Sequence, residues 1–187
     1  MRPQPGAFNL KTSVFIACSL DGFIAREDGN LDWLMSRTPV DGENGYDTFM
    51  AGIDVIVMGR NTFETVLGFE DWPYEGKRVV VLSRAMDDMP ASLQGKVQLH
   101  RGPVRALYDS LAANGCRGLY VDGGLTVQSF IREDLVDELT VTTIPILLGA
   151  GIPLFGHTSR DIPLRLMGTR QLPGGLVQNT YATRLIG

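Results

Sequence analysis

The chain has 187 residues, of which 44% are hydrophobic and 8% aromatic, enough to bury the core of one domain. Its formal net charge of −4, with no cluster of lysine and arginine, argues against a nucleic-acid-binding surface, because phosphate neutralisation needs concentrated basic charge. No apolar run approaches the ~20 residues that cross a bilayer, so no membrane partner is expected.

The cysteines and the first residues set the expected environment. Cys18 and Cys116 are far apart and neither belongs to a CxxC pair, so the sequence offers no metal-ligand spacing and no disulfide framework. We therefore expect no metal ion and a cytoplasmic setting. Residues 1–11, which contain two prolines and no secretory-signal pattern, are expected to be a flexible leader, and residues 12–187 a single domain.

The first apolar run, residues 12–19, lacks clean alternation and is predicted to be a central strand buried on both faces. Residues 20–34 mix turn formers with large apolar side chains, so they form either a substrate lid or a surface loop that plugs the core. Residues 41–52 have helical spacing, and Glu43 and Asp47 lie one turn apart on a shared face. One of these acids could point into a pocket.

Three strands are predicted to end in groups that can bind an anion. Residues 54–58 lead into Gly59 and Arg60, and residues 79–82 lead into Ser83 and Arg84. An arginine fork suits a phosphate, although a first-turn arginine can equally be solvated.

The third such strand end follows residues 119–122, where Gly123 and Gly124 precede a helix. Two adjacent residues without Cβ let a ligand approach the backbone, and the free N–H groups of a helix start favour a phosphate. The same turn is also explained by a tight connection alone. In the helix that follows, Leu125, Ser129 and Phe130 are expected to share one face.

The remaining elements complete the alternation of strand and helix. We expect a weak strand at 97–99, a helix at 104–113, a strand at 136–145, a glycine-hinged connection at 146–155, and a hairpin over 164–185 that turns at 173–175. This order predicts an α/β fold with a mainly parallel central sheet, helices on both faces and an antiparallel C-terminal hairpin. Ligands of such sheets bind beyond the carboxyl ends of the strands.

As an ordered set, these motifs resemble a known family. Val57–Glu64, Val80–Arg84 and Val121–Gly124 are similar to motifs of the dihydrofolate reductase fold. Ser19–Ala25 and Pro145–Phe155 resemble more closely the C-terminal reductase domain of the bacterial bifunctional riboflavin-pathway deaminase-reductase and its stand-alone relatives.

The resemblance implies an NADPH-dependent oxidoreductase that transfers hydride to a small heterocyclic, carbonyl or imine substrate, as 5-amino-6-(5-phosphoribosylamino)uracil reductase does. The turn after Met58 and the pair Ser83–Arg84 would hold the adenosine 2′-phosphate of the cofactor, and residues 123–126 would hold its pyrophosphate. In the family, a peptide bond of this glycine turn is often cis. The implied cofactor-binding residues are Ala17, Ile24, Gly59, Arg60, Asn61, Thr62, Leu82, Ser83, Arg84, Val121, Gly123, Gly124, Leu125 and Thr126.

The resemblance says less about the substrate. It implies catalytic roles for Glu43, Asp47 and Thr142, and pocket-wall positions for Trp33 and Leu34. Folate enzymes bind the substrate's glutamate with an arginine whose place here is taken by Lys77. The deaminase half with its zinc motif is absent from this sequence, and no basic cluster for a ribose phosphate is evident.

Three functions therefore stay open at this point. The first is the riboflavin-pathway type of reductase, the second a dihydrofolate or pterin reductase-like enzyme, and the third a non-catalytic NADPH-binding dimeric module. By resemblance, we expect a homodimer in the cytoplasm.

Overall fold

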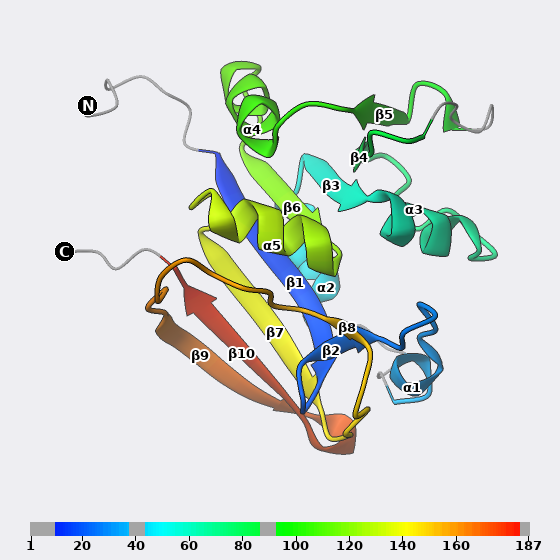
Figure 1. Ribbon diagram of the computed structural model, residues 1–187, viewed down its shortest axis with the longest axis vertical. Coiled ribbons are helices and arrows are strands. Elements are labelled where there is room, and N and C mark those ends of the chain that lie inside the picture. The colour runs from blue at the N-terminus through cyan, green and yellow to red at the C-terminus, as the bar shows by residue number, and fades with distance from the viewer. Residues whose placement is uncertain (1–9, 38–43, 87–92, 184–187) are drawn as a thin grey trace.

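The protein is built around one eight-stranded sheet in the order β5-β4-β3-β6-β1-β7-β10-β9 (Figure 1). The computed structural model describes residues 10–37, 44–86 and 93–183. All pairings from β5 to β7 are parallel, and β7-β10 and β10-β9 are antiparallel. The strands are β1 (Lys11–Ser19), β3 (Val55–Gly59), β4 (Arg78–Leu82), β5 (Val97–His100), β6 (Gly118–Asp122), β7 (Glu138–Ile144), β9 (Arg165–Leu172) and β10 (Leu176–Ala182).

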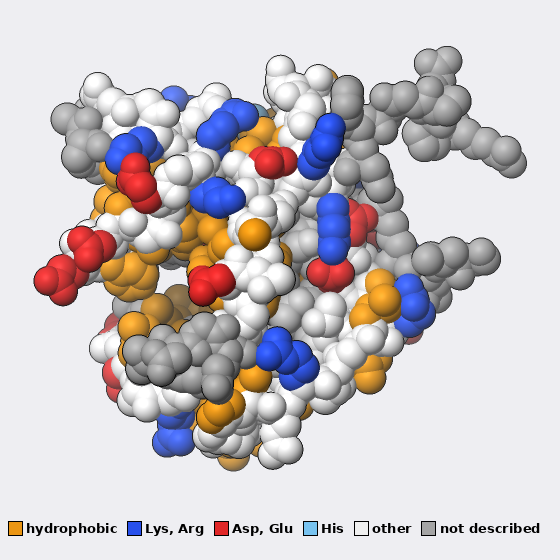
Figure 2. All heavy atoms as spheres, turned by 180° about the vertical axis from the view of Figure 1, so that it is seen from behind, with side chains coloured by type: hydrophobic (Ala, Val, Ile, Leu, Met, Phe, Trp, Pro, Cys, Tyr) orange, Lys and Arg blue, Asp and Glu red, His pale blue; other side chains and the backbone are white. Residues whose placement is uncertain are grey.

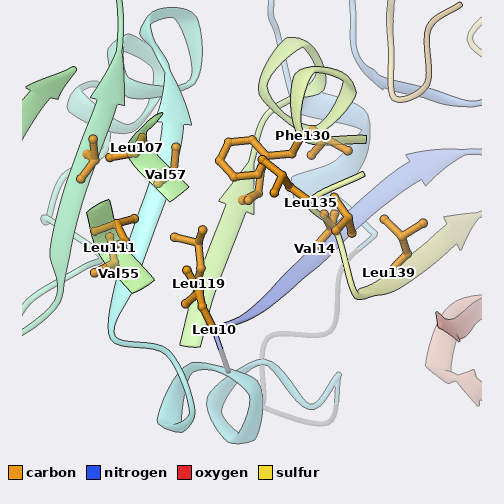
Figure 3. Close-up of a cluster of buried hydrophobic side chains, with 14 of the residues drawn as sticks. Leu10, Val14, Val55, Val57, Leu107, Leu111, Leu119, Phe130, Leu135 and Leu139 are labelled. Atoms are coloured by element: carbon orange, nitrogen blue, oxygen red, sulfur yellow. The ribbon is translucent and has the colours of Figure 1, made fainter. Parts of the chain in front are cut away.

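Helices cover both faces of this sheet. Helices α4 and α5 pack on one face over Val55, Val57 and Val121, a core that Figure 3 shows in part. Helices α2 and α3 pack on the other face over Ile56 and Met58. Successive residues of a strand point to opposite faces, so one apolar run supplies both cores. The helices are α1 (Asp32–Met35), α2 (Tyr46–Ala51), α3 (Arg60–Leu67), α4 (Val104–Ala113) and α5 (Gly124–Arg132).

A small second sheet closes one end of the molecule. In it, β2 (Phe23–Ala25) pairs antiparallel with β8 (Ile152–Pro153). Asp21 fixes the turn before β2, because its carboxylate accepts the Ser19 hydroxyl and the backbone N–H groups of residues 148 and 149 at 2.5–3.1 Å. The loop expected at 20–34 therefore contains β2 and α1, and it is bonded to the glycine-hinged connection.

The predicted fold class is confirmed, including the central place of β1 and the C-terminal hairpin around Pro173–Gly175. Lys11 opens β1 and Leu10 is buried in the core, and residues 1–9 of the expected leader lie outside the described residues. Leu125 is 69% exposed whereas Phe130 is fully buried, so these two residues of α5 do not share a face. No helix in the described parts of the chain is long and apolar enough to cross a membrane.

Candidate active site

A cavity of about 1030 Å³ lies beyond the carboxyl ends of β3, β4 and β6. Figure 2 shows the molecule hollowed on this side, with hydrophobic side chains on the floor of the hollow. The volume is at the upper end of the range for small-molecule sites. The predicted cofactor residues that line the cavity are Ala17, Ile24, Gly59, Arg60, Asn61, Thr62, Leu82, Gly123, Gly124, Leu125 and Thr126.

Three predicted cofactor residues lie outside this lining. Val121 is fully buried in the core under α4 and α5, because it points to the opposite face from its neighbours in β6. The Ser83 hydroxyl accepts the N–H groups of Ala85 and Met86 at 3.3 and 3.1 Å, so it stabilises its own turn. Arg84 follows it and is exposed.

The turn between β6 and α5 is shaped by two glycines. Gly123 has φ +89°, a left-handed conformation that L side chains rarely adopt, and a Cβ there would collide with the Thr62 hydroxyl. A Cβ on Gly124 would lie 2.8 Å from the carbonyl oxygen of Pro153. The described residues contain no cis peptide bond, so the cis peptide that the family resemblance suggested for this turn is not found.

Two helices begin at this cavity, α3 after Gly59 and α5 after Gly123, and their first residues line it. Neither helix start has a side-chain cap. The first N–H groups of a helix have no partner within the helix, and the helix dipole favours negative charge there. Two such starts beside a bare glycine backbone fit the phosphates of a dinucleotide.

Arg60 is the cationic side chain that lines the cavity among the residues the structure describes. Its Nε lies 2.6 Å from Oε1 of Glu64, one turn further along α3. Both side chains are about half exposed, at 48% and 49%, so the pair can open towards a ligand at small cost.

The carboxylate of Asp122 also lines the cavity, directly before the glycine turn and on the face of β6 that carries Tyr120. Its Oδ1 accepts the N–H of Gly123 at 2.8 Å, and its Oδ2 faces the Tyr74 hydroxyl at 3.5 Å. The Tyr120 hydroxyl donates to the carbonyl of Phe15 at 2.9 Å. Phe15, Tyr74 and Tyr120 line the cavity as well, so the carboxylate is framed by aromatic rings.

Burial raises the pKa of Asp122 to about 6, although hydrogen bonds from Gly123, Tyr120 and Tyr74 lower it. Burial also raises the pKa of Tyr74 and of Tyr120, and the Asp122 charge adds to this. The two hydroxyls therefore stay protonated, and the carboxyl group is the one that can exchange a proton near neutral pH.

The predicted catalytic residues are dispersed. Asp47 is exposed on α2 and does not line the cavity, and Glu43 lies outside the described residues. Thr142 is buried on β7 beside Ala17 and lines a separate space of about 80 Å³, where its hydroxyl accepts Nε2 of Gln178 at 3.1 Å.

Of the two residues predicted to form the pocket wall, one lines the main cavity and the other is buried in the core. Leu34 lines the main cavity, whereas Trp33 is buried against Ile144, Leu172 and Leu176. Lys77 does not line the cavity, and its Nζ donates to the carbonyls of Met50 in α2 and of Ile53 just after it, at 2.9 and 2.7 Å. It thus stabilises a helix end.

The outer wall of the cavity is formed by Ile24 and Ile152 of the small sheet. Gln128 of α5 holds this wall, because its Nε2 donates to the carbonyls of Pro153 and Leu154 at 3.1 and 3.4 Å. Helix α5, which begins at the glycine turn, therefore also anchors strand β8.

The sequence analysis did not single out Asp122, Tyr74 or Tyr120. One signal was available for Asp122, because an acid that ends a buried strand directly before two glycines must lie at the ligand-binding edge. The tyrosines could not be found in this way, since Tyr74 reaches the site from a loop 46 residues earlier than Tyr120.

Known proteins resemble this chain over nearly its whole length. The uncharacterized protein YwjB of Bacillus subtilis is 38% identical over 174 residues, which cover 91% of this chain and 97% of YwjB. The riboflavin biosynthesis protein RibD of Corynebacterium ammoniagenes is 28% identical over 156 residues, 75% of this chain but 44% of that protein.

Solved structures agree with these relatives. A putative riboflavin biosynthesis protein from Shewanella sp. PV-4 superposes with a TM-score of 0.88 at 42% identity, covering 94% of this chain and 100% of that one. RibD of Acinetobacter baumannii shares the fold, with a TM-score of 0.72 at 17% identity over 94% of this chain and 58% of that one. The family model described as the RibD C-terminal domain matches residues 11–178, so the chain belongs to the RibD C-terminal domain family.

Proposed function

We propose that this protein is an NADPH-dependent oxidoreductase that reduces a C=N or C=O bond of a small heterocyclic compound, in the manner of a riboflavin-pathway reductase. The observation that carries the proposal is that one cavity combines two uncapped helix starts at a glycine turn with a carboxyl group of pKa about 6. Membership of the RibD C-terminal domain family supports the same reaction class.

In this proposal the dinucleotide lies across the starts of α3 and α5. The backbone from Gly123 to Thr126 holds the pyrophosphate, and Arg60 approaches the 2′-phosphate once it separates from Glu64. Arg84, exposed after β4, is a second cation at the same edge of the sheet. The bound cofactor supplies the hydride that adds to the carbon of the substrate double bond.

The chain itself must provide the proton that adds to the nitrogen or oxygen of that bond. Oδ1 of Asp122 accepts the Gly123 N–H at 2.8 Å, whereas Oδ2 accepts the Tyr74 hydroxyl only at 3.5 Å, so Oδ2 is the more basic oxygen and we assign the proton to it. Transfer of this proton to the substrate completes the addition of two hydrogens, and solvent then reprotonates the carboxylate. The pKa of about 6 suits this exchange.

Two side chains expected for a folate substrate do not reach the cavity. Lys77, which takes the place of the folate-binding arginine, is bonded to carbonyls at and just after the end of α2. Asp47, the helix acid that is described, does not line the cavity. In this proposal the carboxyl group of Asp122 at the end of β6 takes the role expected of that acid.

A fluorescence titration with NADPH tests the proposal, followed by measurement of NADPH oxidation with aminopyrimidine substrates. We expect saturable binding and oxidation that depends on the second substrate. Binding without oxidation by any such compound would favour the non-catalytic module, and absence of NADPH binding would refute the reductase assignment.

We also propose a homodimer, formed along the edge strand β9. Leu166 and Met167 of this strand are 55% and 51% exposed, and Val177 of the adjoining β10 is 36% exposed. An open edge with exposed apolar side chains is usually covered in a stable protein. Light scattering should give a dimer mass for the natural chain and a monomer mass for Leu166→Glu, and a monomeric natural chain would contradict the proposal.

A further inference from the structure

We infer that the compound reduced at this site carries no phosphate or carboxylate, and is a neutral or cationic planar heterocycle. The inference rests on the proposed reductase function and narrows its substrate class. It departs from the phosphorylated compound named for the Thermotoga maritima relative, a 5-amino-6-(5-phosphoribosylamino)uracil reductase with the same fold.

The first argument is the charge of the cavity lining. Among the residues that the structure describes, the lining carries four carboxyl groups and one guanidinium, that of Arg60. A substrate anion that enters this cavity would be repelled by the net negative charge of the lining, and the phosphates of the bound cofactor would add to this repulsion. The four acids of the lining are Glu27, Asp28, Glu64 and Asp122.

The second argument is the position of Arg60. It is the first residue of α3, next to Gly59, and is therefore on the wall that fits a dinucleotide phosphate. In the proposed function this guanidinium separates from Glu64 and binds the 2′-phosphate of the cofactor. The lining that the structure describes then offers no other guanidinium to a phosphate of the substrate.

The third argument is the chemistry around Asp122. The polar groups that act on its carboxyl are the Gly123 N–H and the hydroxyls of Tyr74 and Tyr120. An anion placed beside it would be repelled, whereas a ring N–H or amino group would be bound. The rings of Phe15, Tyr74 and Tyr120 offer flat apolar surface to a planar ligand.

Two cations near the cavity already have partners, and Arg84, at the same edge of the sheet, is assigned to the cofactor in the proposed function. Arg26, next to the lining residue Glu27, forms two hydrogen bonds to Asp32 at 2.8 and 3.2 Å. Lys77 donates to two backbone carbonyls. The internal stretches 38–43 and 87–92 contain no lysine or arginine in the sequence, so they cannot supply one.

The test compares two compounds that differ by one phosphate, 5-amino-6-(ribosylamino)uracil and its 5′-phosphate, with the protein saturated by NADPH. We expect kcat/KM to be at least about tenfold higher for the unphosphorylated compound, the effect of one repulsive charge pair in a partly desolvated site. Equal or better turnover of the phosphate overturns the inference. NADPH binding, measured on the same samples, reports separately on the proposed function.

A charge-reversed variant sharpens the test. Glu27→Lys places a cation on the cavity lining and should shift the preference towards the phosphate by about threefold to tenfold. Glu70→Lys is the matched control, because Glu70 is exposed beyond α3 and does not line the cavity. The inference requires the ratio of the two kcat/KM values to change in the first variant and to stay constant in the second, and an equal change in both contradicts it.

Discussion

The cavity lining has two portions that meet where Asp122 precedes Gly123. We call the portion formed by Gly59 and Gly123–Thr126 the backbone end, because backbone N–H groups exposed by missing side chains are available there. The other portion, the side-chain end, consists of the carboxyl of Asp122 and the aromatic rings that share the lining with it. In the proposed function, the backbone end, which requires only a turn and two helix starts, holds the cofactor. The side-chain end, which one substitution can change, determines which substrate is reduced.

The largest effect should come from the side-chain end. Asp122→Asn keeps the shape of the side chain but removes its transferable proton, so kcat should fall about 10²- to 10⁴-fold. The dissociation constant of NADPH, measured by fluorescence, should not change. Asp47→Asn on the exposed side of α2 is the control and should leave both quantities unaltered. A full loss of NADPH binding in Asp122→Asn would contradict the division of the cavity into two ends.

The same substitution should alter stability. The pKa of Asp122 is about 6 in the folded protein against 3.8 for an ordinary carboxyl, so the folded state binds this proton more tightly. The contribution of the group to stability is therefore greatest below about pH 4 and is lost as the pH rises to about 6. Asp122→Asn should remove this dependence and raise the free energy of unfolding at pH 7 by up to about 3 kcal/mol. Urea unfolding across this pH range measures it.

The backbone end is best tested at its glycine turn. Gly123→Ala must adopt φ near +89° and also displace the Thr62 side chain, so the free energy of unfolding should fall by about 2–3 kcal/mol. NADPH affinity should fall at least about tenfold because the backbone moves. Gly76→Ala has a similar positive φ with open space around it, so it should cost about 1 kcal/mol and leave NADPH binding intact. Equal effects in both variants would show that strain alone matters at the turn.

The smallest effect should come from Arg60, which lies at the backbone end. Arg60→Ala should weaken NADPH by about 1.4 kcal/mol, or tenfold, and NADH much less, because only NADPH carries the 2′-phosphate. The half-exposed side chain and its ion pair with Glu64 limit the size of the loss. Conversely, Glu64→Gln should tighten NADPH binding by releasing the guanidinium. Equal losses for the two cofactors in Arg60→Ala, measured by titration, would contradict its assigned position.

The backbone end of the cavity was accessible from the sequence because it depends on local patterns. An apolar run of four or five residues followed by glycine predicts both the strand and the turn, and α4 begins and ends where its proline and its asparagine-glycine pair predict. Val121 is the exception, since alternation along β6 turns it into the core.

The side-chain end was not accessible because it depends on distant segments. The surroundings of Asp122 include Tyr74 from the loop before β4, Tyr120 from β6 and Phe15 from β1. No spacing in the sequence shows that these groups converge. The predictions for Asp47 and Lys77 came instead from correspondence with positions in folate enzymes, and side chains at corresponding positions can lie elsewhere in another member of one fold.

The bond from Gln128 to the second sheet has a mechanical consequence. This amide ties the carbonyls of Pro153 and Leu154 to the second turn of α5. Helix α5 and strand β8 are therefore joined directly, and a displacement of one would move the other. Because α5 contributes Gly124 to Thr126 to the lining and β8 contributes Ile152, such a movement would shift two walls of the cavity together.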